Sequence, residues 1–336
     1  MVIRVIINKI IDKAKKNKKT ICLVETEDIR TLKAANIVKE MDFANILLVG
    51  HKDKIYSIAK ENNINIDGIE IVDPLTSDKT NELIDKFYEL RKNKGLTYQE
   101  ATDIIKNDYL YFGDMLVYLD YVDGLVAGAT HSSSDVLRAA LKTVKTGDDA
   151  KIVSAFFLME LENKKLGSNG VFIFSDAGMI QNPTSEELVD IAYASSKSFN
   201  ELVGDTPKVA FLSHSTNGSS KCADTEKVRN AVGMFKDKYP NIIADGEMQL
   251  DAAIVPEIAQ SKFPTSKIKG DANTLIFPDL DAGNIGYKIA ERMGNAKAYG
   301  PITQGIRKPI NDLSRGCTEQ DIVGVIAITC VQANKN

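Results

Sequence analysis

The chain of 336 residues contains no tryptophan and only three histidines, which are His51, His131 and His214. The histidines lie far apart without the spacing of a metal-binding motif, so the sequence predicts no metal site. The four cysteines are equally scattered and form no C-x-x-C pair; they are Cys22, Cys222, Cys317 and Cys330. Scattered cysteines in a chain of this length are typical of reduced thiols in a cytosol rather than of a disulfide scaffold.

The sequence also lacks a long apolar run and an excess of one charge. None of its apolar runs approaches the roughly 20 residues that a membrane-spanning helix needs. The segment Met1 to Ile11 contains Arg4 and Lys9 and leads into lysines, which predicts an amphipathic first helix ending near Lys18 rather than a secretory signal. The formal net charge of −4 does not indicate the basic surface of a nucleic-acid-binding protein. We therefore expect a soluble cytoplasmic protein that binds neither membrane nor nucleic acid, although local arginines could still hold an anionic substrate.

Two fingerprints of nucleotide-binding enzymes are missing as well. Neither G-x-x-x-x-G-K-[ST] nor G-x-G-x-x-G occurs anywhere in the chain, and the segment Thr216–Lys221 resembles a phosphate-binding loop only loosely. A nucleoside triphosphatase or a typical dinucleotide-dependent dehydrogenase would be expected to carry one of these motifs. The sequence therefore favours neither class.

Short apolar runs alternate with helical patterns along nearly the whole chain. The runs predict strands at Thr20–Val24, Asn45–Val49, Glu70–Val72, Gly124–Ala127, Val171–Phe174, Val209–Leu212 and Thr274–Phe277. The segments between them predict helices at Asp28–Lys39, Asn81–Lys92, Ser133–Lys145, Glu186–Ser198, Thr225–Lys238 and Ile285–Met293. This alternation is typical of α/β proteins whose mostly parallel sheets carry helices on both faces. Candidate domain boundaries are the glycine-containing acidic segment 146–149 and the segment Tyr299-Gly300-Pro301.

The segment from Asp312 to Val323 is the richest in chemistry. Within a few residues it contains the hydroxyl of Ser314, the guanidinium of Arg315, a glycine and the carboxylate of Asp321, just before an apolar helix. That set suits an anionic substrate that is held at one end and deprotonated near the other. However, Thr318 and Asp321 also have the spacing of a capping box, and pattern alone favours this structural interpretation.

Other helix starts and ends leave similar alternatives open. The segment Thr130–Asp135 begins a helix whose N–H groups could bind a phosphate, while Arg138 could bind a ligand or pair with Asp135 one turn away. The segment Asp281–Gly286 could hold a ligand, or Asn284 could be an ordinary helix N-cap. The basic segment Arg91–Gly95 could complement a helix dipole or bind phosphate groups.

Taken together, the motifs resemble the phosphate acetyltransferases of the phosphate acetyl/butyryltransferase family over essentially the whole chain. The similar segments are Val24–Arg30, Leu32–Ala35, Gly124–Ser132, Phe174–Ala177, Asp245–Ala253, Phe277–Asn284, Gly300–Gly305 and Ser314–Val323. The resemblance implies two three-layer αβα domains with an active-site cleft between them. It places residues 1–148 and 301–336 in the first domain and residues 149–300 in the second.

The resemblance also implies a reaction, namely reversible acetyl transfer between coenzyme A (CoA) and inorganic phosphate by direct attack of the CoA thiolate in a ternary complex. It implies that Asp321 is the general base, that Arg315 grips the phosphoryl group and that Ser314 stabilises the transition state. Residues implied to contact CoA or the other substrate are Arg91, Arg138, Thr130, Ser132, Asn284 and Gln304. CoA, acetyl-CoA, acetyl phosphate and phosphate are then substrates, and no cofactor is bound permanently. A homodimer and a metabolic link to acetate kinase are further implications.

Three alternatives remain open from the sequence. A phosphate butyryltransferase would share the fold and the chemistry, because acyl-chain length depends on pocket volume. A decarboxylating dehydrogenase on a related architecture would need a nicotinamide cofactor and usually a metal ion, and a non-catalytic module would bind CoA without turnover.

Cys317, at a helix start, could be a nucleophile, but no histidine lies nearby in sequence, and we predict a structural role for it.

Overall fold

The computed structural model describes residues 5–148 and 150–335, so Asp149 of the first candidate boundary lies outside the described residues. The chain divides into two compact units. The terminal unit contains residues from Ile7 to Asp148 and from Ile306 onward, and the central unit contains the residues between them together with those up to Ile6. The chain therefore returns to the terminal unit at residue 306 rather than at the predicted residue 301. The reason is that strand β10, Lys297–Gln304, pairs with β5, Ser154–Glu160, inside the central unit.

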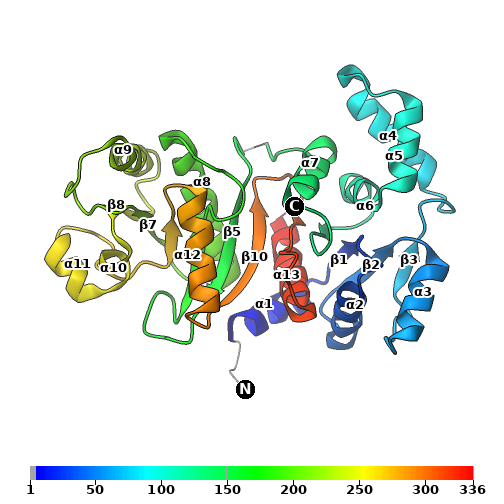
Figure 1. The fold of residues 1–336 in the computed structure, drawn as a ribbon, viewed down its shortest axis with the longest axis horizontal. Helices are drawn as coiled ribbons and strands as arrows, with labels where there is room; N and C mark the ends of the chain where they lie inside the picture. The colour runs from blue at the N-terminus through cyan, green and yellow to red at the C-terminus, as the bar shows by residue number, and fades with distance from the viewer. Residues whose placement is uncertain (1–4, 149, 336) are drawn as a thin grey trace. The chain divides into compact units, whose positions relative to one another are not determined.

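The terminal unit is built on a five-stranded sheet in the order β11-β4-β1-β2-β3 (Figure 1). All of its strand pairs are parallel. The strands are β1 Thr20–Leu23, β2 Asn45–Val49, β3 Glu70–Val72, β4 Gly124–Val126 and β11 Ile310–Asn311. Parallel strands are buried on both faces, which explains why these segments are continuous apolar runs rather than alternating ones. All the carboxyl ends meet at one edge of the sheet.

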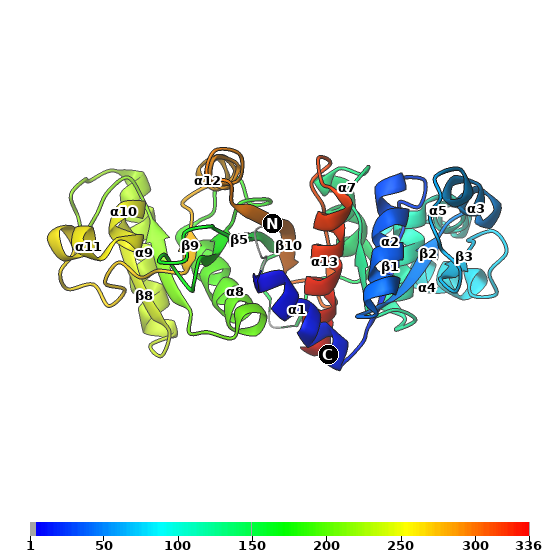
Figure 2. The same cartoon turned by 90° about the horizontal axis from the view of Figure 1, so that it is seen from below.

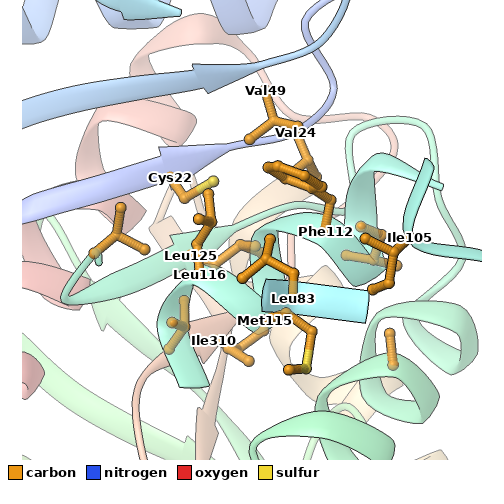
Figure 3. Close-up of a cluster of buried hydrophobic side chains, with 14 of the residues drawn as sticks. Cys22, Val24, Val49, Leu83, Ile105, Phe112, Met115, Leu116, Leu125 and Ile310 are labelled. Carbon is orange, nitrogen blue, oxygen red and sulfur yellow. The ribbon is translucent and has the colours of Figure 1, made fainter. Parts of the chain in front are cut away.

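Helices cover both faces of this sheet. Helix α13 packs against β4 and β1 and lies beside α2, as Figure 2 also shows, while α6 packs against β4, β1 and β2 from the opposite face. The core under α6 joins Cys22 and Leu125 of the sheet to Phe112, Met115 and Leu116 of the helix (Figure 3). Besides α1, Val5–Lys16, most of which belongs to this unit, its α-helices are α2 Ile29–Met41, α3 Lys52–Glu61, α4 Thr80–Arg91, α5 Tyr98–Asn107, α6 Tyr109–Tyr118, α7 Ser133–Thr143 and α13 Glu319–Gln332.

The central unit has a six-stranded mixed sheet in the order β10-β5-β6-β9-β7-β8. Strands β10 and β5 are antiparallel to their neighbours, and the other pairs are parallel. The remaining strands are β6 Val171–Ser175, β7 Lys208–Leu212, β8 Ile243–Met248 and β9 Thr274–Ile276. Its helices are α8 Ser185–Val203, α9 Ala223–Lys238, α10 Leu250–Ile254, α11 Pro256–Lys262 and α12 Leu280–Arg292. Two separate apolar clusters lie on the two faces of the sheet, one including α8 and α9 and the other α10 and α12.

The α/β class with parallel sheets and helices on both sides is confirmed, and every predicted strand and helix is present with ends shifted by a few residues. The amphipathic first helix is α1, Val5–Lys16 within the described residues. Strands β5, β8, β10 and β11 and helices α3, α5, α6, α10 and α11 were not predicted. Among the described residues, no helix combines the length and apolar character that crossing a membrane requires.

Candidate functional site

Three loops meet at the carboxyl edge of the terminal sheet. They follow the neighbouring strands β1, β4 and β11, and they carry Glu25, the segment 127–132 and the segment 312–318. In open α/β sheets, this edge is where ligands bind. The parallel order therefore brings together two of the sequence motifs that lie almost 200 residues apart in the chain.

The buried carboxylate of Glu25 organises the loop after β4. Its oxygens accept hydrogen bonds from the backbone N–H groups of Ala129 (2.7 Å), Thr130 (2.8 Å) and His131 (2.8 Å). The hydroxyl of Thr130 (2.9 Å) and the ring Nδ1 of His131 (2.8 Å) bond to the same carboxylate. Burial opposes ionisation of Glu25, but the hydrogen bonds from His131 and Thr130 outweigh it and lower the pKa of Glu25 to about 2.

Arg30 ties the β1 and β4 loops to the C-terminal segment. Its guanidinium pairs with Asp28 and donates to the carbonyl oxygen of Ala129 at 3.0 Å. It also donates to the carbonyl oxygens of Arg315 at 2.9 Å and Cys317 at 2.8 Å. A planar guanidinium has five N–H donors in a fixed arrangement, so one side chain can hold all these loops together.

The segment that Arg30 holds presents Ser314, Arg315 and Gly316 to solvent. The carbonyl oxygen of Ser314 accepts a bond from the N–H of Cys317 at 2.9 Å, which closes a tight turn. The guanidinium of Arg315 makes no hydrogen bond or ion pair within the described part of the chain. The two side chains predicted to handle the reacting groups are therefore exposed on a fixed backbone.

Cys317 lies on the inner side of the same turn. Its residue exposure is 8%, and burial raises the pKa of its thiol to about 11. A thiol in this state is protonated and weakly nucleophilic at neutral pH. The geometry agrees with the predicted structural role of this cysteine.

Asp321 forms the capping box that its spacing predicts. One oxygen, Oδ2, accepts from the N–H of Thr318 at 2.9 Å and from its hydroxyl at 2.8 Å, and the hydroxyl accepts from the N–H of Asp321 at 3.3 Å. The other oxygen, Oδ1, has no hydrogen-bond donor among residues 5–148 and 150–335. Capping occupies one carboxylate oxygen, which leaves the second available to a ligand.

A second carboxyl group, Asp312, was not singled out from the sequence. It follows β11 and is fully buried, and neither of its oxygens makes a well-formed hydrogen bond within the described residues. Burial raises its pKa to about 7, although Ser133 and the N–H of Leu313 lie close enough to oppose that shift. Its neighbour Gly128 has φ +112°, and a Cβ atom there would lie 2.2 Å from Oδ1, so only glycine fits.

The arginines Arg91 and Arg138 come from α4 and α7 and both lie near Tyr111 of α6. Burial raises the pKa of Tyr111, whereas the charges of Arg138 and Arg91 act in the opposite direction. Lys142, one turn after Arg138, has its ammonium 5.8 Å from the centre of the same ring. Arg138 also forms the expected 2.8 Å pair with Asp135, on the surface. We call these three cations around Tyr111 the basic cluster.

Two predicted ligand residues lie in the loop before α7 and already have structural partners. The hydroxyl of Thr130 donates to Glu25, and the hydroxyl of Ser132 donates to Asp135 at 2.6 Å and caps its N–H at 3.2 Å. The backbone N–H groups of residues 129–131 are likewise bonded to Glu25. The phosphate-binding N–H groups expected at this helix start are therefore partly occupied by the protein itself.

The two remaining predicted ligand residues belong to the central unit. The amide of Gln304 is buried and bonds to four serines, Ser154, Ser175, Ser195 and Ser198, which indicates a structural role and gives no support to ligand binding. Asn284 is not the N-cap of α12, because the helix begins at Leu280 and Asp279 caps it. Asn284 lies inside the helix and donates to the carbonyl oxygen of Ala177 at 3.3 Å. Among the described residues, no cluster of histidine, cysteine and acidic side chains could hold a metal ion.

Comparison with known proteins identifies the family of this chain. The sequence profile of the family described as Phosphate acetyl/butaryl transferase matches residues 5–330. This chain belongs to that family. A phosphate acetyltransferase of Thermoanaerobacterium thermosaccharolyticum is 51% identical over 328 residues, which cover 98% of this chain and 99% of the relative. The phosphate acetyltransferase of Acetivibrio thermocellus is 49% identical over 327 residues, or 97% of this chain and 98% of the relative.

A solved structure extends the similarity to three dimensions. A phosphotransacetylase from Streptococcus pyogenes matches with a TM-score of 0.92 at 36% identity, and the match covers 100% of both chains. The resemblance inferred from the sequence is therefore confirmed, and the comparisons favour an acyltransferase over a dehydrogenase.

Proposed function

We propose that this chain is an acyltransferase that interconverts acetyl-CoA and phosphate with acetyl phosphate and CoA. The observation that carries the proposal is the close similarity to phosphate acetyltransferases over nearly the full length of both proteins. The carboxyl edge of the terminal unit supplies groups of the right chemistry, namely an exposed arginine, an exposed hydroxyl and a carboxylate with one unoccupied oxygen.

In the proposed mechanism, Oδ1 of Asp321 takes the proton from the CoA thiol. The thiolate attacks the carbonyl carbon of acetyl phosphate, and the tetrahedral intermediate collapses to acetyl-CoA and phosphate. Arg315 binds the phosphoryl oxygens, because a guanidinium matches them in charge and geometry. Ser314 donates a hydrogen bond to the oxyanion that develops during attack.

The basic cluster around Tyr111 is our candidate for the phosphate groups of CoA. Arg91 and Arg138 come from different helices, and their charges lie near the same ring. Lys142, which is half-buried in the last turn of α7, adds a third positive charge. Three cations at one place suit a ligand with several phosphate groups.

Cys317 takes no covalent part in this mechanism, because its thiol is buried and protonated. We further propose that the enzyme works in the cytoplasm as a homodimer beside acetate kinase and holds no permanent cofactor. A preference for acetyl over butyryl donors follows from the names of its relatives.

The direct test is formation of the CoA thioester by purified protein with acetyl phosphate, with butyryl phosphate in parallel and a metal chelator present. We expect rapid acetyl transfer, slower butyryl transfer and no effect of the chelator. Faster butyryl transfer would assign the protein to the butyryl branch of the family. No thioester from either donor would refute the proposed function.

A further inference from the structure

His131 has one ring nitrogen fixed by a buried acid. Its Nδ1 lies 2.8 Å from Oε1 of Glu25, whose side chain is 2% exposed, and its own backbone N–H bonds to the same oxygen. This double attachment sets both the position of the residue and the orientation of its ring. The other two histidines lack such an arrangement, since His51 pairs with a more exposed carboxylate of Asp73 and His214 approaches only the hydroxyl of Ser220.

The opposite ring nitrogen, Nε2, is unused. The side chain of His131 is 34% exposed, and no hydrogen-bond partner for Nε2 occurs in the described ranges 5–148 and 150–335. The hydrogen bond to Glu25 raises the pKa of His131 against the opposing effect of burial, which favours the doubly protonated ring. A protonated imidazole has an N–H donor on both nitrogens, so Nε2–H is free to donate.

Both acidic groups and hydrogen-bond donors lie near His131, and the acidic groups are Glu25, Asp108 and Asp135. Arg30 bonds to the carbonyl oxygen of Ala129, two residues before His131, and to the carbonyl oxygen of Arg315, which brings the two loops together. At the start of α7, the N–H groups of Ser133 and Ser134 have no acceptor within the part of the chain that the structure describes. The imidazole, these N–H groups and Arg315 are donors from two adjoining loops.

We propose that His131 is a further substrate-binding residue, whose Nε2–H donates to a phosphoryl oxygen of acetyl phosphate or inorganic phosphate beside Arg315. This inference rests on the proposed function. It invokes no proton transfer, only a charge-assisted hydrogen bond from an imidazole that Glu25 holds in place. The competing interpretation is that His131 only stabilises the loop through Nδ1.

Two substitutions separate these interpretations, because they retain different halves of the imidazole. In His131→Asn, the short side chain places its amide N–H near the position of Nδ1, so the bond to Glu25 is retained and Nε2 is lost. In His131→Gln, the longer side chain places its amide N–H near the position of Nε2 and loses the bond to Glu25. The two variants are therefore matched controls for each other.

The measurements are KM for acetyl phosphate, KM for CoA and the inhibition constant of inorganic phosphate, with thermal unfolding of each variant. A hydrogen bond to a charged group corresponds to a roughly tenfold to hundredfold change in affinity. We expect His131→Asn to raise KM for acetyl phosphate and the inhibition constant of phosphate by that factor, with KM for CoA within about threefold. His131→Gln should show a much smaller rise.

Any other pattern overturns the inference. A larger effect in His131→Gln than in His131→Asn assigns the residue to loop stability, and an equal rise for acetyl phosphate and CoA indicates a displaced loop. The wild-type rate is measured first, because an inactive wild-type protein would refute the proposed function itself, and the inference would fail with it. An active wild-type protein with unchanged phosphate affinity in His131→Asn would refute the inference alone.

Discussion

Replacing Asp321 with asparagine separates its structural role as a helix cap from its proposed catalytic role as a general base. The side-chain amide keeps one oxygen, which can accept from the N–H and hydroxyl of Thr318 as Oδ2 does at 2.9 and 2.8 Å. The capping bonds are therefore retained, and only the negative charge and the basicity of the carboxylate are lost. Loss of the charge at a helix start costs about 0.3–1 kcal/mol of stability.

The effect on catalysis should be much larger. Loss of a general base lowers turnover by about 10²-fold or more, which corresponds to at least ~2.7 kcal/mol in the activation free energy. We expect kcat to fall by this factor while KM for both substrates changes little. The assay is the initial rate of acetyl-CoA formation under saturating acetyl phosphate and CoA.

Thr318→Val is the matched control, because it removes the capping hydroxyl and keeps the carboxylate. It should cost about 1 kcal/mol of stability and lower Tm by roughly 2–4 °C, with kcat within several-fold of wild type. If Asp321→Asn instead keeps the wild-type kcat, Asp321 is only a helix cap and the proposed mechanism is wrong.

Three further substitutions test the surrounding groups. Cys317→Ala should leave kcat within a few-fold in the same assay, because the thiol is buried with a pKa of about 11. Glu25→Gln should destabilise the protein by about 3 kcal/mol at pH 7, since the pKa of Glu25 falls from 4.5 to about 2 on folding. Urea unfolding should show this difference above about pH 5 and its loss as the pH falls toward 2. Asp312→Asn should stabilise the protein at pH 8 relative to wild type and much less at pH 4. The pKa of Asp312 rises from 3.8 to about 7 on folding, so between these values the unfolded chain ionises and the folded chain does not, and wild type loses stability as the pH rises toward 7. Thermal unfolding at the two pH values measures this change.

The opposite results would be informative for each group. Loss of most activity in Cys317→Ala would indicate a covalent role for the thiol. Equal stability of wild type and Glu25→Gln at pH 7 would show that the bonds to the β4 loop contribute little. A destabilised Asp312→Asn variant at pH 8 would show that the ionised carboxylate has a favourable partner.

The elements of regular, strongly apolar sequence were predictable. The parallel strands β1, β2 and β3 are short buried runs, and helices α2, α4, α7, α8 and α9 have clear periodicity, so local pattern sufficed. Strand β10 contains Gly300 and Pro301, which normally end a strand, and its pairing with β5 shifts register there. Strand β11 is only two residues long, and its existence depends on pairing with β4.

The candidate site was predictable in its exposed residues and not in its supporting contacts. Ser314, Arg315 and Asp321 stand in one local motif, which the sequence displays directly. The hydrogen bonds between Glu25 and residues 129–131 join positions that lie more than 100 residues apart in the sequence, and no local pattern indicates them. The burial of Asp312 could not be predicted, because nothing in the sequence shows that a carboxyl next to Leu313 is fully buried.

The central claim is direct transfer of the acetyl group from phosphate to CoA without an acyl-enzyme intermediate. The most direct test incubates the protein with acetyl phosphate and isotopically labelled inorganic phosphate, first without CoA and then with it. Direct transfer predicts no label in acetyl phosphate until CoA is added, because phosphate can re-enter only by attack on acetyl-CoA. Incorporation of label without CoA, at a rate comparable to turnover, would demonstrate an acyl-enzyme and contradict the account.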